Sequence, residues 1–143
     1  MNSPTGEFAL IARHLSALGA PRSDVSVAVG DDAAILEPAP GTECCSACAC
    51  VALAHGPNQR LAQSVAATIE NLVVRLQDDG FTPAWATLVL TLSRTDDTLV
   101  RVLAAAVHSA CTAHGIAVIG GDTTAGASSL TIFLTGLRTE SAR

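Results

Sequence analysis

Two short acidic segments of the chain, each following a run of apolar residues, have the residue types that phosphate chemistry uses. They read VGDDAAIL over Val29–Leu36 and VIGGDTTAG over Val118–Gly126. Glycines allow the backbone to approach a ligand and to present N–H groups to a phosphate, while carboxylates can hold an accompanying Mg²⁺. Neither segment matches a Walker or dinucleotide-binding pattern, and Gly-Asp-Asp also occurs in plain turns. Phosphate binding and simple turn formation therefore both remain open at this point.

A run of cysteines offers a second kind of chemistry. Four of the five cysteines lie in the segment CCSACAC, residues 44–50. On a strand, residues two apart share a face, so Cys44, Cys48 and Cys50 should point together and Cys45 should point away. Such thiols could bind a soft metal ion, Zn²⁺ or Cu(I), or form a reactive thiol site. The spacing matches no standard zinc pattern, and cysteine also packs as a small buried residue.

The composition excludes several classes of function. The 143 residues are 49% hydrophobic and 15% charged, and the net charge is −5. The chain contains eight arginines and no lysine. The negative charge argues against nucleic acid or an anionic membrane as a partner, and the missing lysine excludes P-loop and Schiff-base chemistry. No apolar run reaches the roughly 18–20 residues of a membrane span, and the first residues do not resemble a signal peptide. We therefore expect a cytoplasmic protein with free thiols.

The pattern of apolar residues predicts a single α+β domain over residues 1–143. Gly120–Gly126 is expected to be a loop between two strands, and the cysteine run is expected to continue to Ala54 as a strand buried on both faces. Apolar spacing at helical or alternating periods predicts three helices and five further strands. The helices are expected over residues 7–18, 62–76 and 98–114, and the strands over 25–29, 33–36, 86–92, 116–119 and 129–137. Thr95-Asp96-Asp97 is expected to cap the N-terminus of the third helix.

Four motifs in order resemble one enzyme family. GEFALIARHL, VGDDAAIL, PAWATLVLTL and GIAVIGGDTTAG are similar to segments of thiamine-monophosphate kinase, which is related to aminoimidazole-ribonucleotide synthase. The resemblance implies an N-terminal ATP-binding domain with a mixed four-stranded sheet, helices on one face and dimerisation through the sheet. It also implies Mg²⁺-dependent phosphorylation of thiamine monophosphate by ATP. The family has a further C-terminal domain, and this chain ends at Arg143, just after that boundary.

Several site residues carry over by this resemblance. Asp32 corresponds to a metal-binding aspartate, and Gly121 and Asp122 to the Gly-Asp that contacts nucleotide and metal. His55 corresponds to a substrate-contacting histidine. Ser46 is the first residue at the position where the family has the sequence Ser-Thr-Asp. In the family, this segment contributes metal ligands.

Three other positions depart from the family pattern. The resemblance places a metal-binding aspartate at Cys48 and the preceding threonine at Ala47. A further metal-bridging aspartate falls on Arg75, or on Val74 after a one-residue shift. Because phosphoryl transfer depends on metal ions that neutralise charge, these replacements should remove most of the kinase activity.

We therefore expect a stand-alone, degenerate domain without the parent kinase activity, recruited as a homodimeric ligand-binding or new-function protein in a specialised pathway. A separate partner enzyme could supply missing parts. One alternative is an active Mg²⁺-dependent ATP phosphotransferase, and another is a soft-metal or thiol site at Cys44, Cys48 and Cys50, with His55 nearby. Mg²⁺ and ATP are the expected cofactors if the family site works, and otherwise none.

Overall fold

The secondary structure alternates strands and helices along the chain. The computed structural model describes residues 9, 11–30, 33–53 and 56–140. In chain order, the elements are η1 (Ile11–Leu15), β1 (Val25–Val27), β2 (Ile35–Leu36), β3 (Thr42–Ala52), α2 (Asn58–Asp78), β4 (Thr82–Leu92), α3 (Asp97–Ala113), β5 (Ala117–Ala125) and β6 (Ser129–Thr139). The element η1 is a short π-helical segment.

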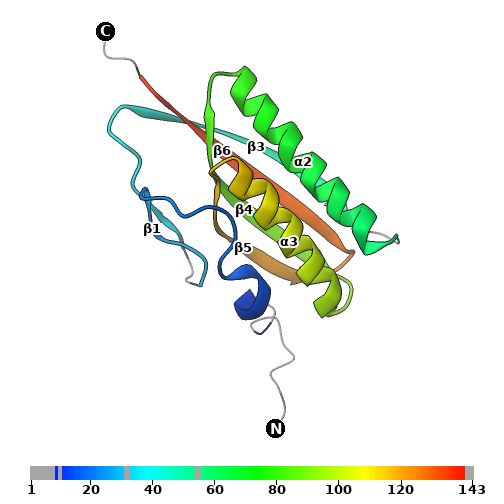
Figure 1. The fold of residues 1–143 in the computed structure, drawn as a ribbon. Coiled ribbons are helices and arrows are strands. Elements are labelled where there is room, and N and C mark those ends of the chain that lie inside the picture. The colour runs from blue at the N-terminus through cyan, green and yellow to red at the C-terminus, as the bar shows by residue number, and fades with distance from the viewer. Residues whose placement is uncertain (1–8, 10, 31–32, 54–55, 141–143) are drawn as a thin grey trace.

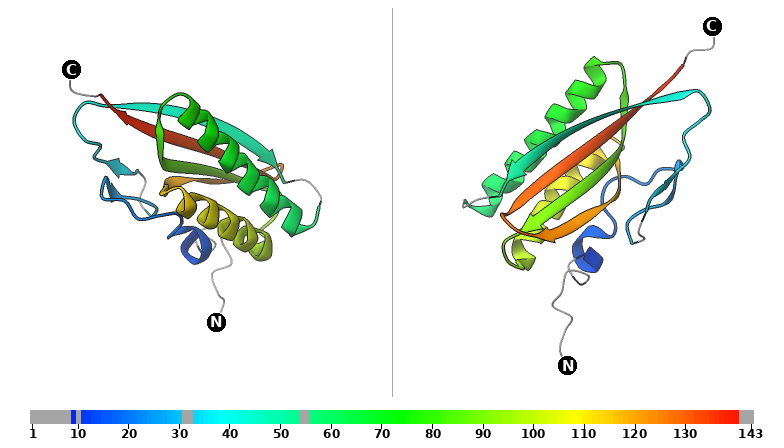
Figure 2. Two further views of the ribbon diagram at one scale, coloured as in Figure 1. Left: turned by 45° about the horizontal axis from the view of Figure 1, so that its top comes forward. Right: turned by 180° about the vertical axis from the view of Figure 1, so that it is seen from behind.

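Four of these strands form a mixed sheet in the order β3-β6-β4-β5, and β1 and β2 pair separately. β6 runs antiparallel to both β3 and β4, whereas β4 and β5 are parallel because α3 connects them. Helices α2 and α3 lie together on one face of this sheet (Figure 1). Seen from behind, the four strands lie in front of both helices, and no helix of the described residues covers this open face (Figure 2). The expected α+β fold, with a mixed sheet and helices on one face, is confirmed.

The core lies between the helices and the sheet. Alternate residues of β4, namely Leu88, Leu90 and Leu92, are buried on the helix side. Ile132 and Leu134 of the central strand β6 are fully buried beside them. From the helices, the core receives Val65, Ile69, Leu72, Val73, Leu76, Val100, Leu103 and Val107. The helical spacing of apolar residues and the alternation along the strands therefore meet in one layer.

Both predicted long helices are present. Helix α2 begins four residues before its predicted start at residue 62, and α3 begins one residue before its predicted start at residue 98. The N-terminus of α3 has the expected cap, because the Asp96 carboxylate accepts a hydrogen bond from the Leu99 N–H at 2.9 Å. Among the described residues, no helix is long and apolar enough to cross a membrane.

The expected helix over residues 7–18 is wrong in its C-terminal part, since helical geometry ends at Leu15. The backbone that follows Leu15 instead forms hydrogen bonds with residues at the start of β5. The Leu18 carbonyl accepts a hydrogen bond from the Val118 N–H at 3.3 Å, and the Ala20 N–H donates to the Ile116 carbonyl at 2.7 Å. Tertiary pairing with β5 therefore ends the helix before its apolar pattern does.

The cysteine run is a strand, as expected, but it is not buried on both faces. β3 is an edge strand, and only its helix-side residues Cys45, Ala47, Ala49 and Val51 pack against the core. The predicted alternation is confirmed, because Cys44, Cys48 and Cys50 are exposed on the open face. The continuous run of small apolar residues suggested that both faces of this strand are buried. Both helices cover the same face of the sheet, so the other face of β3 stays exposed.

The short β1–β2 pair covers one end of the open face. There Trp85 of β4 is only 4% exposed and packs with Val25, Leu36, Ala117 and Leu137. Its indole Nε1–H donates to the Asp24 carboxylate at 3.2 Å, and Arg22 donates to both oxygens of Asp24 at 2.7 and 2.9 Å. The Arg22 guanidinium holds the pKa of Asp24 below its usual value.

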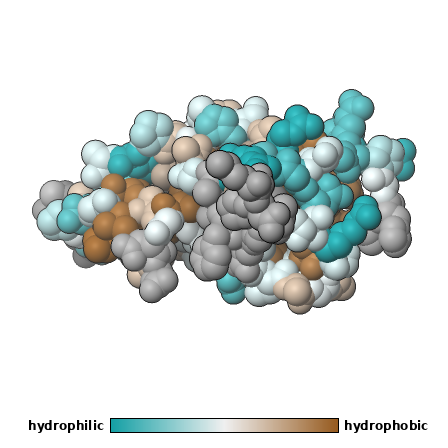
Figure 3. All heavy atoms as spheres, turned by 90° about the horizontal axis from the view of Figure 1, so that it is seen from below, coloured by the Kyte–Doolittle hydropathy of each residue, from teal (hydrophilic) through white to brown (hydrophobic). Residues whose placement is uncertain are grey.

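The same pair leaves apolar surface exposed. Hydrophobic residues gather on the side of the molecule where β1 lies (Figure 3). Ile35 of β2 is 52% exposed. The β1–β2 pair is held against the sheet by the hydrogen bond from Trp85 to Asp24 and by the packing of Val25 and Leu36 on Trp85.

Candidate functional site

The fold brings the two acidic segments together on the open face of the sheet. A hollow of about 360 Å³ lies between residues 33–34, within the first acidic motif, and the second motif on β5. Its lining consists of Ala33, Ala34, Thr87, Val89, Ile119, Gly120, Gly121 and Asp122. Two segments almost ninety positions apart in the chain thus form one surface.

The expected loop over residues 120–126 is wrong, because β5 continues as a strand to Ala125. The parallel pairing with β4 places Thr87 opposite Gly120 and Val89 opposite Asp122. Since paired residues share a face of a sheet, these four positions face the hollow. The glycines that suggested a loop pair with β4 directly after a register shift that leaves Ile119 without a partner on β4.

Gly120 keeps the hollow open. A β-carbon at this position would meet no atom within 4 Å, so it would project into free space. Asp122 beside it is exposed, and its carboxylate accepts a hydrogen bond from the Thr123 N–H at 2.9 Å. Asp122 is the only charged group among the described lining residues, and the remaining carboxylate oxygen is available to a cation.

Gly121 has a structural role that does not depend on a ligand. Its φ is +156°, and a β-carbon there would overlap the carbonyl oxygen of Leu88 on β4. The close approach of β5 to β4 therefore requires glycine at this position. Its predicted role in nucleotide binding is not tested by the fold and stays a prediction.

Ser46 and Cys48 lie on the same face as Asp122 but at the opposite edge of the sheet. The strand order places β6 and β4 between β3 and β5, so three strand spacings of about 4.8 Å separate them by about 14 Å. The register runs Cys48–Phe133–Thr87–Gly120 across the sheet. The Ser46 hydroxyl instead lies 3.2 Å from the Thr135 hydroxyl.

The predicted metal site stays a prediction. Asp32 and His55 lie outside the described residues. In the described part of the chain, no group of three or more His, Cys, Asp or Glu side chains is arranged to hold a metal ion. Ser46 would need a ligand or metal array that extends across the width of the sheet in order to act with Asp122.

The downstream position that the family resemblance assigns to an aspartate lies on α2. Both Arg75 and Val74 are exposed residues of this helix. Because α2 covers the opposite face of the sheet, neither residue contributes to the lining of the hollow. With either alignment, this position offers the hollow no carboxylate.

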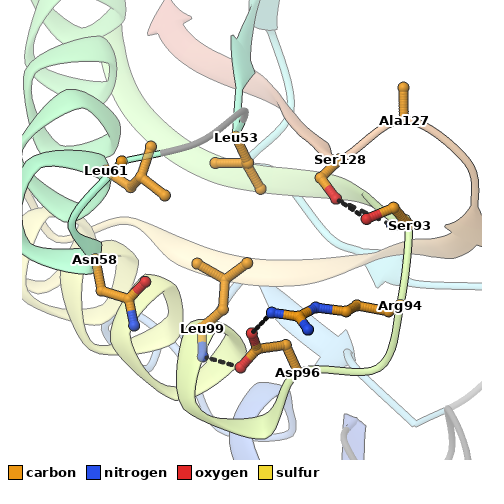
Figure 4. Close-up of a pocket in the computed structure, with 10 residues that line it drawn as sticks. Leu53, Asn58, Leu61, Ser93, Arg94, Asp96, Leu99, Ala127 and Ser128 are labelled. Atoms are coloured by element: carbon orange, nitrogen blue, oxygen red, sulfur yellow. Dashed lines mark hydrogen bonds and ion pairs between the residues drawn. The ribbon is translucent and has the colours of Figure 1, made fainter.

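A larger pocket of about 690 Å³ opens where the sheet meets the starts of both helices (Figure 4). Its polar groups include Asn58, Ser93 and Arg94, and Arg94 pairs with Asp96 at 3.6 Å. Leu53 and Gly56, which flank the undescribed residues 54–55, also line it.

Sequence reasoning missed part of each surface. Thr87 and Val89 reach the hollow only because β4 pairs with β5, and Arg94 reaches the larger pocket because it follows the end of β4. A usable signal existed for the first two residues. In ATLVLTL, threonine and valine alternate with leucine, which indicates that they share the face opposite to the core.

Comparison with known families identifies the fold. Residues 30–137 match the family model described as AIR synthase related protein, N-terminal domain. The chain belongs to this family. The match begins at Gly30, in the first acidic motif, and ends at Leu137 near the end of β6. It therefore includes the hollow and all four strands of the main sheet.

Thiamine-monophosphate kinases are among the relatives. The enzyme from Salmonella typhimurium is 32% identical over 137 residues, which cover 92% of this chain and 41% of the enzyme. The enzyme from Escherichia coli K12 is also 32% identical over the same length. The chain thus spans about two fifths of the length of the curated relatives that it matches.

Solved structures show the same fold. The thiamine-monophosphate kinase from Stenotrophomonas maltophilia superposes with a TM-score of 0.72 at 29% identity, covering 82% of this chain and 38% of that enzyme. AaThiL complexed with AMPPCP and TMP has a TM-score of 0.60 at 18% identity, covering 96% of this chain and 44% of that protein. The hydrogenase maturation protein HypE in complex with ATP has a TM-score of 0.54 at 16% identity, covering 75% and 33%.

Proposed function

We propose that this chain is a degenerate ligand-binding domain of its family, which binds a phosphate-bearing ligand such as a nucleotide without transferring a phosphoryl group. The observation that carries the proposal is the hollow at Gly120 and Asp122. It joins both acidic motifs and provides open space above a glycine beside a carboxylate. A phosphate could lie over Gly120 while a cation on Asp122 neutralises its charge.

Binding needs fewer carboxylates than catalysis. Mg²⁺ is usually held by one or two carboxylates together with waters and the phosphates of the ligand. Asp122 supplies one carboxylate, and Asp32 immediately precedes the lining residue Ala33 in the chain. This number of carboxylates suits one Mg²⁺ that binds together with the ligand.

Phosphoryl transfer would need further metal ligands. It proceeds through positioning and neutralisation of developing charge, for which kinases and related enzymes use metal ions held on both sides of the reacting phosphate. The positions that the resemblance assigns to additional aspartates hold Cys48 and Arg75. A thiol is a poor ligand for Mg²⁺, and a guanidinium cannot be one. We therefore propose that the kinase activity is lost while ligand binding is kept.

The relatives suggest which ligands to test. One similar structure is described as complexed with AMPPCP and TMP, and another as complexed with ATP. ATP, ADP and the thiamine phosphates are thus the first candidates, each with and without Mg²⁺. The larger pocket at Leu53 and Gly56 is the proposed place for a second, non-nucleotide part of the ligand.

Replacement of Gly120 by leucine tests the hollow directly. The side chain would fill the space beside Asp122 without meeting another atom near its β-carbon, so the domain should stay folded. We expect Gly120→Leu to weaken binding of Mg-ATP at least tenfold in titration calorimetry. Gly120→Ala is the matched control and should keep the affinity within about threefold. Equal affinities of the leucine variant and the wild type would contradict the proposed site.

We also propose that a second copy of the chain covers the open sheet face. Phe133 lies in the middle of this face and is 40% exposed, and no helix of the described residues covers it. β3 is in addition an eleven-residue edge strand with unpaired backbone groups. Sedimentation velocity at several concentrations should show a dimer that Phe133→Glu dissociates. A monomer at every concentration would contradict this assembly.

A further inference from the structure

The open face of the main sheet carries almost no charge. The four strands β3, β4, β5 and β6 contain three charged residues, Glu43, Asp122 and Arg138. Arg138 donates two hydrogen bonds to the Glu43 carboxylate, at 2.6 and 2.8 Å, and lies over the Phe81 ring. Because Glu43 and Arg138 alternate with residues of the open face, this ion pair lies on the helix side. In the described strands, Asp122 is therefore the only charged residue on the open face.

The rest of this face has the composition of an interface core. Its central rows consist of small, hydroxyl-bearing and apolar residues beside Asp122, and they run Cys48–Phe133–Thr87–Gly120 and Cys50–Thr131–Val89–Asp122. Charged residues are depleted at the cores of protein–protein interfaces, and aromatic residues are enriched there. Phe133 is such an aromatic residue, since it is 40% exposed in the middle of the face. The composition suits contact with a second copy of the chain, with the exception of Asp122.

Asp122 lies within the area that a second copy centred on Phe133 would cover. It is two strands from Phe133, about 9.6 Å, and one row along the sheet, about 6.7 Å, which together give about 12 Å. A standard interface buries about 800 Å² per partner, which corresponds to a round patch with a radius of about 16 Å. Since a twofold dimer uses the same patch on both copies, it would bury two such carboxylates.

No positive side chain in the described part of the chain neutralises Asp122. Its carboxylate accepts one hydrogen bond, from the Thr123 N–H at 2.9 Å, and none of the ion pairs between described residues includes it. Removal of a carboxylate from water without a counter-charge opposes association. The hollow beside Asp122 has a volume of about 360 Å³, compared with about 30 Å³ for one water molecule in the liquid. A divalent cation with several of its waters therefore fits between the carboxylate and a second copy.

We propose that the charge of Asp122 controls assembly, so that two copies associate through the open face when a divalent cation occupies the hollow and separate when it is removed. The inference rests on the proposed dimer and on the proposed cation at Asp122, and it adds the coupling between them. Coupling between two binding events is reciprocal, so the dimer also binds the cation more tightly than the monomer does. The physical reason is that a face removed from water strengthens the attraction between cation and carboxylate.

The test is sedimentation velocity over a range of protein concentrations, in millimolar Mg²⁺ and in EDTA at equal ionic strength. For the wild type, we expect a dimer Kd at least tenfold lower with Mg²⁺ than with EDTA. Asp122→Asn keeps the shape of the side chain and an oxygen for the Thr123 N–H, but it removes the charge. This variant should dimerise in EDTA as tightly as the wild type does with Mg²⁺, and Mg²⁺ should leave its Kd unchanged.

Asp78→Asn is the matched control. Asp78 is exposed at the end of α2, which covers the opposite side of the sheet. Its replacement removes one negative charge from the chain, as Asp122→Asn does, but not from the open face. The control should therefore show the same dependence on Mg²⁺ as the wild type.

The possible failures are distinguishable. A wild-type dimer with the same Kd in Mg²⁺ and in EDTA would overturn the coupling and leave the dimer itself in place. A monomer under every condition, for the wild type and Asp122→Asn alike, would overturn the dimer as well. A response to Mg²⁺ that persists in Asp122→Asn would show that the cation acts elsewhere. An Asp78→Asn dimer that no longer needs Mg²⁺ would show a general effect of net charge, and either of these last two results would overturn the role of Asp122.

Discussion

Gly121→Ala is expected to destabilise the domain by about 3 kcal/mol, the consequence of one added methyl group at a strand pair. A β-carbon at this position would overlap the Leu88 carbonyl oxygen, and a φ of +156° is unfavourable for alanine. The backbone of β5 would have to move away from β4, where Leu88 and Gly121 are paired. Urea unfolding should show this loss, and the melting temperature should fall by about 10 °C.

The neighbouring glycine provides the control. Gly120→Ala adds the same methyl group on the same strand but into open space, so its stability should stay within about 0.5 kcal/mol of the wild type. The contrast between two adjacent glycines tests the described geometry more sharply than either variant alone. Equal stabilities of the two variants would show that β5 does not approach β4 as closely as the structure describes.

Leu134→Ala is expected to cost about 3–4 kcal/mol. Leu134 lies on β6, between β3 and β4, and its side chain is fully buried against the helix layer. Truncation removes apolar contacts and leaves a cavity that the central strand cannot close, because it is hydrogen-bonded on both sides. Chemical denaturation monitored by circular dichroism should measure the difference.

Val74→Ala is a suitable control for this prediction. Val74 is apolar like Leu134 but is 52% exposed on the outer side of α2. Its truncation should change the free energy of unfolding by less than about 0.5 kcal/mol. A large effect at Val74, or a small one at Leu134, would contradict the placement of the core between the helices and the sheet.

The local elements could be predicted because their patterns come from physical periodicity. The alternation of Cys44, Cys48 and Cys50 with core-facing residues appeared as expected, and the cap at Asp96 did too. The wrong expectations share a cause. Burial on both faces of β3 and a loop after Gly120 were inferred from local composition, whereas strand position and partner decide both.

Only some residues of the candidate site could be predicted from the sequence, for the same reason. Gly121 and Asp122 stood out by residue type, but Thr87 and Val89 join them through pairing between strands that are about thirty positions apart. Residue type also could not separate two roles of glycine. Gly121 is required by close packing on Leu88, while Gly120 leaves space for a ligand.

Phosphorus NMR of the protein mixed with Mg-ATP and thiamine monophosphate tests the central claim most directly, because one spectrum reports both binding and turnover. We predict that the ATP resonances broaden or shift in proportion to wild-type protein and much less with Gly120→Leu. No resonances of ADP or thiamine diphosphate should appear during prolonged incubation. Accumulation of either product above a protein-free control, or ATP resonances that are identical with wild type and Gly120→Leu, would contradict a domain that binds a phosphorylated ligand without transferring its phosphate.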